Sequence, residues 1–378
     1  MAMKLIHVFA LIGALFVAGP AQADDIDDCN GNAPDRAVRG CTRVIADRAL
    51  PKTALALAYG QRGFAYFNLG HVQAAKADFT AATKQDPRNA HLWYLLGYLC
   101  ISEGDNTEGV RYMTKALELL PNNANYHLER GVAHSRLGNS EQAIIDYTNA
   151  IRIDKRFALA HFNRGVAYWQ RENHQAAIAD LSTSIGLDPQ YAPAYLRRGM
   201  YNYALKQYHL VLADLDEAVR LNPANPEALF QRGRIHFVYE RYDNAIADNS
   251  KAIALNPRAK GPWTNRGISY VRTEQYDLAL KDLNTALELD PIDAFARYNR
   301  AVVHAIKGNY RIARDDIDAA IELRPKHADQ FYVRGIIKAA LGDQTGGIID
   351  RERAVELEPR LGEIGTGVLR PIEYFAKN

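Results

Sequence analysis

The stretch HFNRGVAYWQ, residues 161–170, decides the fold, because its features return along the chain at a fixed spacing. Gly165 belongs to a series of glycines placed 34 residues apart, and a proline and two small residues repeat with the same period. Self-similarity with a period of about 20–50 residues indicates a repeat architecture. The series consists of Gly63, Gly97, Gly131, Gly165, Gly199, Gly233, Gly267 and Gly335, with Ala301 in the remaining place.

Each repeat predicts two α-helices. The first helix surrounds the glycine, a short turn follows, and the second helix ends at the repeated proline, for example Pro189. A small residue, such as Ala177, stands twelve positions after almost every glycine. We expect the two helices to cross closely at these two positions, because large side chains would hold them apart.

Over residues 54–359 the chain resembles the tetratricopeptide repeat (TPR) family. The resemblance rests on the glycine, the small residues twelve and nineteen positions after it, the proline, and a frequent aromatic residue four positions before the glycine. The resemblance implies an all-α, right-handed superhelical solenoid of nine 34-residue helix-turn-helix repeats. Residues 24–53 are expected to form an N-terminal cap segment with a half-repeat helix. Residues 360–378 are a C-terminal tail, which either caps the last repeat through Val368, Leu369 and Phe375 or stays unstructured.

The N-terminus has the pattern of a secretory signal peptide over residues 1–23, with Lys4, an apolar run and the cleavage sequence Ala21–Ala23. We expect export to a bacterial periplasm with no transmembrane anchor after cleavage; the alternative is a retained N-terminal anchor. Export permits disulfides. We expect one between Cys29 and Cys41, with two free thiols as the alternative, and we expect Cys100 to be a buried small hydrophobe.

An arginine precedes the repeated glycine, and an aspartate follows the glycine by fifteen positions, in every repeat but one. Both are absent from the same repeat, where Leu96 and Tyr112 stand instead. This joint loss predicts an ion pair within each hairpin, because one partner alone would be a costly unpaired charge. The alternative is a ladder of arginines that binds an anion. The predicted pairs are Arg62–Asp78, Arg130–Asp146, Arg164–Asp180, Arg198–Asp214, Arg232–Asp248, Arg266–Asp282, Arg300–Asp316 and Arg334–Asp350.

No catalytic motif is present in the sequence, so we expect neither an enzyme nor a cofactor. His127, His134 and His161 invite a metal hypothesis, but other repeats hold aromatic residues at these positions, which favours packed histidines. The formal net charge of +2, without a basic patch, argues against a nucleic-acid partner.

The resemblance implies that the first helices line a concave groove, at positions three before, one after and four after the glycine. Aromatic residues at these positions, with amide and arginine side chains two positions before the glycine, suit an extended peptide or a partner's helix. The alternative for any one of the aromatics is that it only packs between repeats. The candidate groove residues are Tyr94, Tyr98, Phe162, Asn163, Trp169, Arg197, Tyr203, Phe230, Asn265 and Asn299.

Some TPR proteins bind C-terminal carboxylates through a clamp of Lys and Asn, but the lysine positions of that clamp hold Gly60, Tyr94 and Leu128 here. The prediction is therefore a periplasmic scaffold that binds a protein or peptide of unknown identity, in envelope assembly or secretion. The alternative is a glycan-binding or polysaccharide-export accessory protein, for which Glu129 and Glu227 are the carboxylates beside the aromatics.

Overall fold

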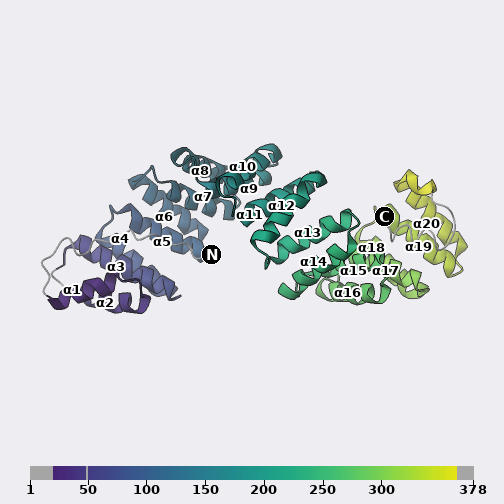
Figure 1. Ribbon diagram of the computed structural model, residues 1–378, viewed down its shortest axis with the longest axis horizontal. Coiled ribbons are helices and arrows are strands. Elements are labelled where there is room, and N and C mark those ends of the chain that lie inside the picture. The colour runs from purple at the N-terminus through teal and green to yellow at the C-terminus, as the bar shows by residue number, and fades with distance from the viewer. Residues whose placement is uncertain (1–19, 48–49, 364–378) are drawn as a thin grey trace. The chain divides into compact units, whose positions relative to one another are not determined.

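The computed structural model describes residues 20–47 and 50–363, and in these ranges the protein is built from α-helices (Figure 1). It divides into two units, residues 1–189 and 190–378, which are described separately. The predicted signal peptide before residue 20 and the tail residues Val368, Leu369 and Phe375 lie outside the described ranges. None of the described helices is long and apolar enough to cross a membrane.

The first unit contains α1 (Pro20–Asn30), α2 (Pro34–Ala46), α3 (Lys52–Asn68), α4 (Val72–Gln85), α5 (Ala90–Ser102), α6 (Asn106–Leu119), α7 (Ala124–Arg136), α8 (Ser140–Ile153), α9 (Ala158–Gln170) and α10 (His174–Leu187). The second unit contains α11 (Ala192–Ala204), α12 (Tyr208–Leu221), α13 (Pro226–Val238), α14 (Tyr242–Leu255), α15 (Lys260–Arg272), α16 (Tyr276–Leu289), α17 (Ala294–Ile306), α18 (Tyr310–Leu323), α19 (Ala328–Ala340), α20 (Gln344–Leu357) and the 3-10 helix η2 (Pro359–Glu363).

From α3 onward the odd-numbered helices are the first helices of repeats and the even-numbered helices are the second. In each unit a first helix packs on its own second helix, and that second helix packs on the next first helix. Successive first helices also touch, as α5 touches α7 and α13 touches α15. The predicted all-α solenoid of helix-turn-helix repeats is therefore confirmed.

The close helix crossing follows from the small residues. A Cβ atom added at Gly335 on α19 would lie 2.8 Å from the backbone oxygen of Gly347 on α20, and one added at Gly347 would lie 2.7 Å from the oxygen of Gly335. Distances this short leave room only for hydrogen at both positions, so the twelve-residue spacing marks where the hairpin closes.

The turn inside each hairpin needs one residue with a left-handed backbone. Gly138 fills this position with φ of 78°, but Lys206 fills the equivalent position two repeats later with φ of 59°. The turn geometry is therefore kept where the sequence lacks glycine, at the cost of Cβ strain.

The N-terminal cap differs from the expectation of a single half-repeat helix. The segment before α2 is itself helical, and α1 packs on α2 and touches α3. The predicted disulfide is present: Cys29 on α1 is bonded to Cys41 on α2, and both residues are buried. The cap is thus a cross-linked helical hairpin laid against the first repeat.

Candidate functional site

The structure contains the predicted arginine–aspartate contacts within the hairpins. Arg164 on α9 donates to both carboxylate oxygens of Asp180 on α10, with Nε–Oδ2 at 2.7 Å and Nη2–Oδ1 at 2.9 Å. Such two-point pairing fixes both position and orientation. The same paired contacts join Arg62–Asp78, Arg130–Asp146, Arg198–Asp214, Arg232–Asp248, Arg266–Asp282, Arg300–Asp316 and Arg334–Asp350.

The arginines also reach the preceding repeat, which the sequence reasoning missed. The Nη1 atom of Arg164 donates to the hydroxyl of Thr148 on α8, at 3.1 Å. Each such arginine therefore ties its own hairpin to the second helix before it. A short polar residue sixteen positions before the arginine is the sequence signal that could have revealed this. Further examples at this spacing are Arg130–Thr114, Arg232–Asp216, Arg266–Ser250, Arg300–Asn284 and Arg334–Asp318. Arg62 donates in the same way to Thr42 on the cap helix α2, which stands twenty positions before it.

The repeat without the ion pair uses aromatic packing. Tyr112, in the aspartate position, stacks on Trp93 with ring centroids 5.9 Å apart, and the Arg111 guanidinium lies 4.1 Å from its centroid. Leu96 is buried in the arginine position. In this repeat, aromatic and apolar packing thus takes the place of the arginine–aspartate ion pair.

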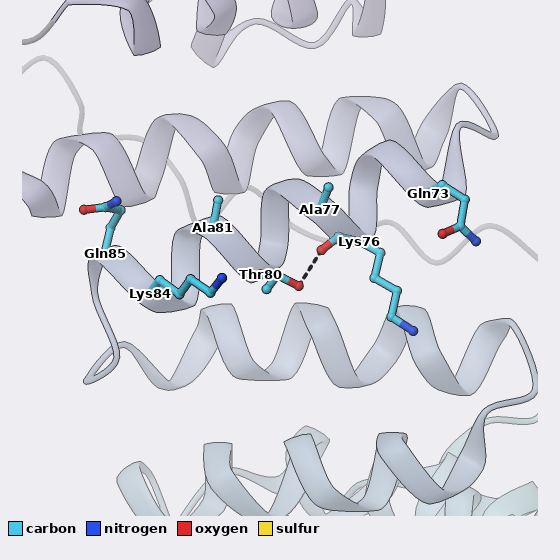
Figure 2. A pocket seen from close by; sticks show the side chains of 7 residues that line it. All are labelled: Gln73, Lys76, Ala77, Thr80, Ala81, Lys84 and Gln85. Atoms are coloured by element: carbon cyan, nitrogen blue, oxygen red, sulfur yellow. Dashed lines mark hydrogen bonds between the residues drawn. The ribbon is translucent and has the colours of Figure 1, made fainter.

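The face of α4 that carries Thr80 lies beside this exceptional repeat. Figure 2 shows Thr80, the residue equivalent to Thr148, with its hydroxyl donating to the carbonyl of Lys76 on the same helix, at 2.7 Å. A hollow of about 490 Å³ on this face is lined by Gln73, Lys76, Ala77, Thr80, Ala81, Lys84 and Gln85. Its described lining comes from α4 alone and offers two lysines, two amides and the Thr80 hydroxyl around alanines.

The three histidines are distributed along the repeats. The Nδ1 atom of His127 lies 3.1 Å from the Asp146 carboxylate, and that of His161 lies 3.0 Å from the Asp180 carboxylate. Both therefore extend the ion pairs. In the described part of the chain, no group of three or more His, Cys, Asp or Glu side chains is arranged to hold a metal ion. Cys100 is buried, and burial raises the pKa of its thiol.

The first-helix face, defined as the residues at the three predicted groove positions and their contacts, is aromatic in the first unit. Tyr98 on α5 contacts Phe67 on α3, with centroids 6.1 Å apart, and Tyr94 stacks on Tyr126 of α7 at 4.8 Å. The rings thus connect three successive first helices. Tyr126, outside the predicted positions, was missed by the sequence reasoning.

Burial separates the predicted groove residues into two groups. Tyr94 and Asn265 are only 5% and 7% exposed, so they pack inside the first-helix face. Arg197 is exposed, and the remaining members are part-buried and reachable: Tyr98, Phe162, Asn163, Trp169, Tyr203, Phe230 and Asn299.

Charged groups lie beside the rings in both units. In the first, Glu129 is buried, and burial raises the pKa of its carboxyl to about 7. In the second, the Arg234 guanidinium lies 4.3 Å from the Tyr203 centroid and 5.8 Å from that of Phe230. Arg234 also donates to Gln231, which in turn donates to Glu227.

The comparisons with known proteins agree with this architecture. The family model described as tetratricopeptide repeat matches residues 61–124, 128–192, 194–260 and 264–328. The chain belongs to the tetratricopeptide repeat family. TPR proteins bind proteins or peptides and are in general not enzymes, so the chain has the fold of a protein-interaction scaffold. No curated protein matches the sequence.

Solved structures share the TPR fold. A chain of the APC/C hetero-tetramer Cut9–Hcn1 matches with a TM-score of 0.51 and 19% identity, over 88% of this chain and 62% of that one. This TPR protein therefore spans less than two thirds of that relative. Pseudomonas aeruginosa PilF matches with a TM-score of 0.50 and 20% identity, over 55% of this chain and 94% of its own. YrrB, described as a TPR protein with an unusual peptide-binding site, matches with a TM-score of 0.40 and 25% identity, over 47% of this chain and 92% of its own.

Proposed function

We propose that this TPR protein is a periplasmic scaffold that binds an extended segment of a partner protein along its first-helix face. The observation that carries the proposal is the run of rings on successive first helices, where Tyr98 and Phe67 remain part-exposed beside buried neighbours. Part-exposed aromatic side chains supply large contact areas at interfaces. The envelope assembly or secretion role is part of this proposal.

Two features support the periplasmic location. The sequence over residues 1–23 has the pattern of a signal peptide, which predicts export. The buried disulfide between Cys29 and Cys41 suits an oxidising compartment.

The second candidate function is glycan binding. It is favoured by the Glu129 carboxyl, whose charge acts on the neighbouring Tyr94 and Tyr98 side chains. Sugar sites combine aromatic faces with carboxylates, but Glu129 is 8% exposed and offers little surface to a hydroxyl group.

The test is chemical crosslinking of the purified mature protein in periplasmic extract, followed by mass spectrometry. The proposal expects a crosslinked protein whose contacts map to first helices such as α5 and α11. Capture of no protein, together with retention on cell-wall or capsular glycan, would overturn it in favour of the second candidate.

A further inference from the structure

The further inference concerns Arg272, at the end of α15 in the second unit. Its guanidinium lies 5.4 Å from the ring centroid of Phe237 on α13, and its Nη1 atom is buried without a hydrogen-bond partner in the described structure. Burial lowers the pKa of this guanidinium, and among the described carboxylates only that of Glu240 acts on it, without direct contact. A partly desolvated cation without a direct ion-pair contact is costly to hold in a fold.

The repeat that contains Arg136 shows what Arg272 lacks. Arg136 on α7 occupies the same repeat position four repeats earlier, and its Nη1 atom donates to the carbonyl of Ile101 at 2.6 Å. Seven residues before it on the same helix stands Glu129, and the charge of Arg136 lowers the pKa of that carboxyl against the effect of burial. In the first unit, therefore, the arginine has a carbonyl acceptor on α5, and its charge acts on a carboxyl group of its own helix.

Asn265 stands in the place of that carboxylate in the second unit. It lies seven residues before Arg272, on the same side of α15, because seven residues make about two helical turns. Asn265 is 7% exposed, and its Nδ2 atom has no hydrogen-bond partner among the described residues. The second unit thus has two donor atoms without a hydrogen-bond partner, Arg272 Nη1 and Asn265 Nδ2. The equivalent repeat of the first unit has the Glu129 carboxyl group and an arginine with an acceptor.

We propose that the carboxylate missing beside Arg272 is supplied by an aspartate or glutamate side chain of the bound partner segment. The planar guanidinium of arginine matches a carboxylate in shape and charge. The Nη1 atom of Arg272 is buried, but the residue as a whole is part-exposed, so a segment lying on the face would reach the exposed part of the side chain. Arg234, over the rings of Tyr203 and Phe230, adds a second positive charge to the same face. The inference rests on the proposed function and specifies the chemistry of the partner: an extended, acidic segment with apolar neighbours.

A random dodecapeptide library displayed on phage, selected on the purified full chain, tests this proposal. The enriched peptides should share one acidic position. Fluorescence polarisation with a synthetic enriched peptide should show affinity lowered at least about tenfold when that residue is changed to its amide or when Arg272→Met is introduced, because a charge-assisted pair is lost.

The variant that separates this proposal from general loss of structure is Asn265→Glu. It restores on α15 the carboxylate that Glu129 provides on α7, so it should lower affinity for the acidic peptide to a similar degree while circular dichroism and melting temperature remain at the wild-type level. Arg136→Met in the first unit is the matched control and should leave this affinity unchanged.

The outcomes are distinguishable. Enrichment of neutral or basic peptides, or full binding by both the Arg272→Met and Asn265→Glu variants, overturns the acidic-segment proposal and leaves the scaffold function standing. Tighter binding of a phosphoserine peptide than of the glutamate peptide overturns the carboxylate as the ligand. Enrichment of no peptide overturns both the proposal and the function on which it rests.

Discussion

Replacement of Arg164 by leucine tests the energetic role of one ion pair. Asp180 is 6% exposed and accepts from Arg164 Nε at 2.7 Å and Nη2 at 2.9 Å, with His161 Nδ1 at 3.0 Å as its third contact. The variant leaves a buried carboxylate with the imidazole alone, and loss of one partner of a buried pair costs about 3–5 kcal/mol. The contact with Thr148 in the preceding repeat is lost as well.

The chain itself supplies the compensating change. Leu96 and Tyr112 replace the pair in one repeat, so Arg164→Leu combined with Asp180→Tyr should cost at least about 2 kcal/mol less than the sum of the two single variants. Because solenoids unfold through neighbouring units, the measurement is amide hydrogen exchange of α9 and α10 by mass spectrometry. The single variant should exchange at least about 100-fold faster in these helices.

Additive effects in that cycle, within about 0.5 kcal/mol, would refute the pairing argument. A charge-reversed pair, Arg164→Asp with Asp180→Arg, gives an independent check. The architectural role predicts partial recovery of protection relative to Arg164→Asp alone, whereas an anion-binding ladder predicts none.

Three further predictions follow from local features. Cys29→Ser should destabilise the α1–α2 hairpin by about 3 kcal/mol, because its loop of 12 residues loses closure, and limited proteolysis should then cut before α3. Lys206→Gly should stabilise the second unit by up to about 1 kcal/mol in urea unfolding, since φ is 59° there; unchanged or lower stability would contradict the strain argument. Glu129 has a folded pKa of about 7 against an ordinary 4.5, so the folded state binds more protons between these values and stability should fall by about 3 kcal/mol as pH rises through that window. Glu129→Gln should abolish that slope in pH-dependent melting curves, and a persistent slope would locate the titrating group elsewhere.

The repeat period allowed most of the fold to be predicted, because the position where two helix backbones approach closely requires a small residue. Gly335 and Gly347 show this requirement in the last hairpin. The joint absence at Leu96 and Tyr112 likewise predicted which charges pair. The left-handed turn at Lys206 was not predictable from the residue type, because lysine disfavours this backbone conformation and only the surrounding repeat imposes it. The helical form of residues 20–30 was missed because its apolar contacts are made with α2 and α3, and the disulfide joins it to α2.

The candidate site was predictable only in outline. The groove positions follow from helix periodicity, but the sequence does not tell whether a ring such as Tyr94 is covered by its neighbours or open to a partner. Arg136 and Arg272 escaped notice because they share a position in only two repeats. Their difference depends on hydrogen-bond acceptors from neighbouring helices, which composition does not reveal.

Photocrosslinking from defined positions tests the central claim most directly. A photoreactive phenylalanine analogue replaces Tyr98 or Tyr203 on the first-helix face, and Ile145 or Ile312 on second helices serve as controls, being 56% and 51% exposed. The account predicts that a periplasmic protein is crosslinked from Tyr98 and Tyr203 with a yield at least about tenfold above the controls. Equal yields from both sets, or crosslinks only from Ile145 and Ile312, would show that the partner binds elsewhere.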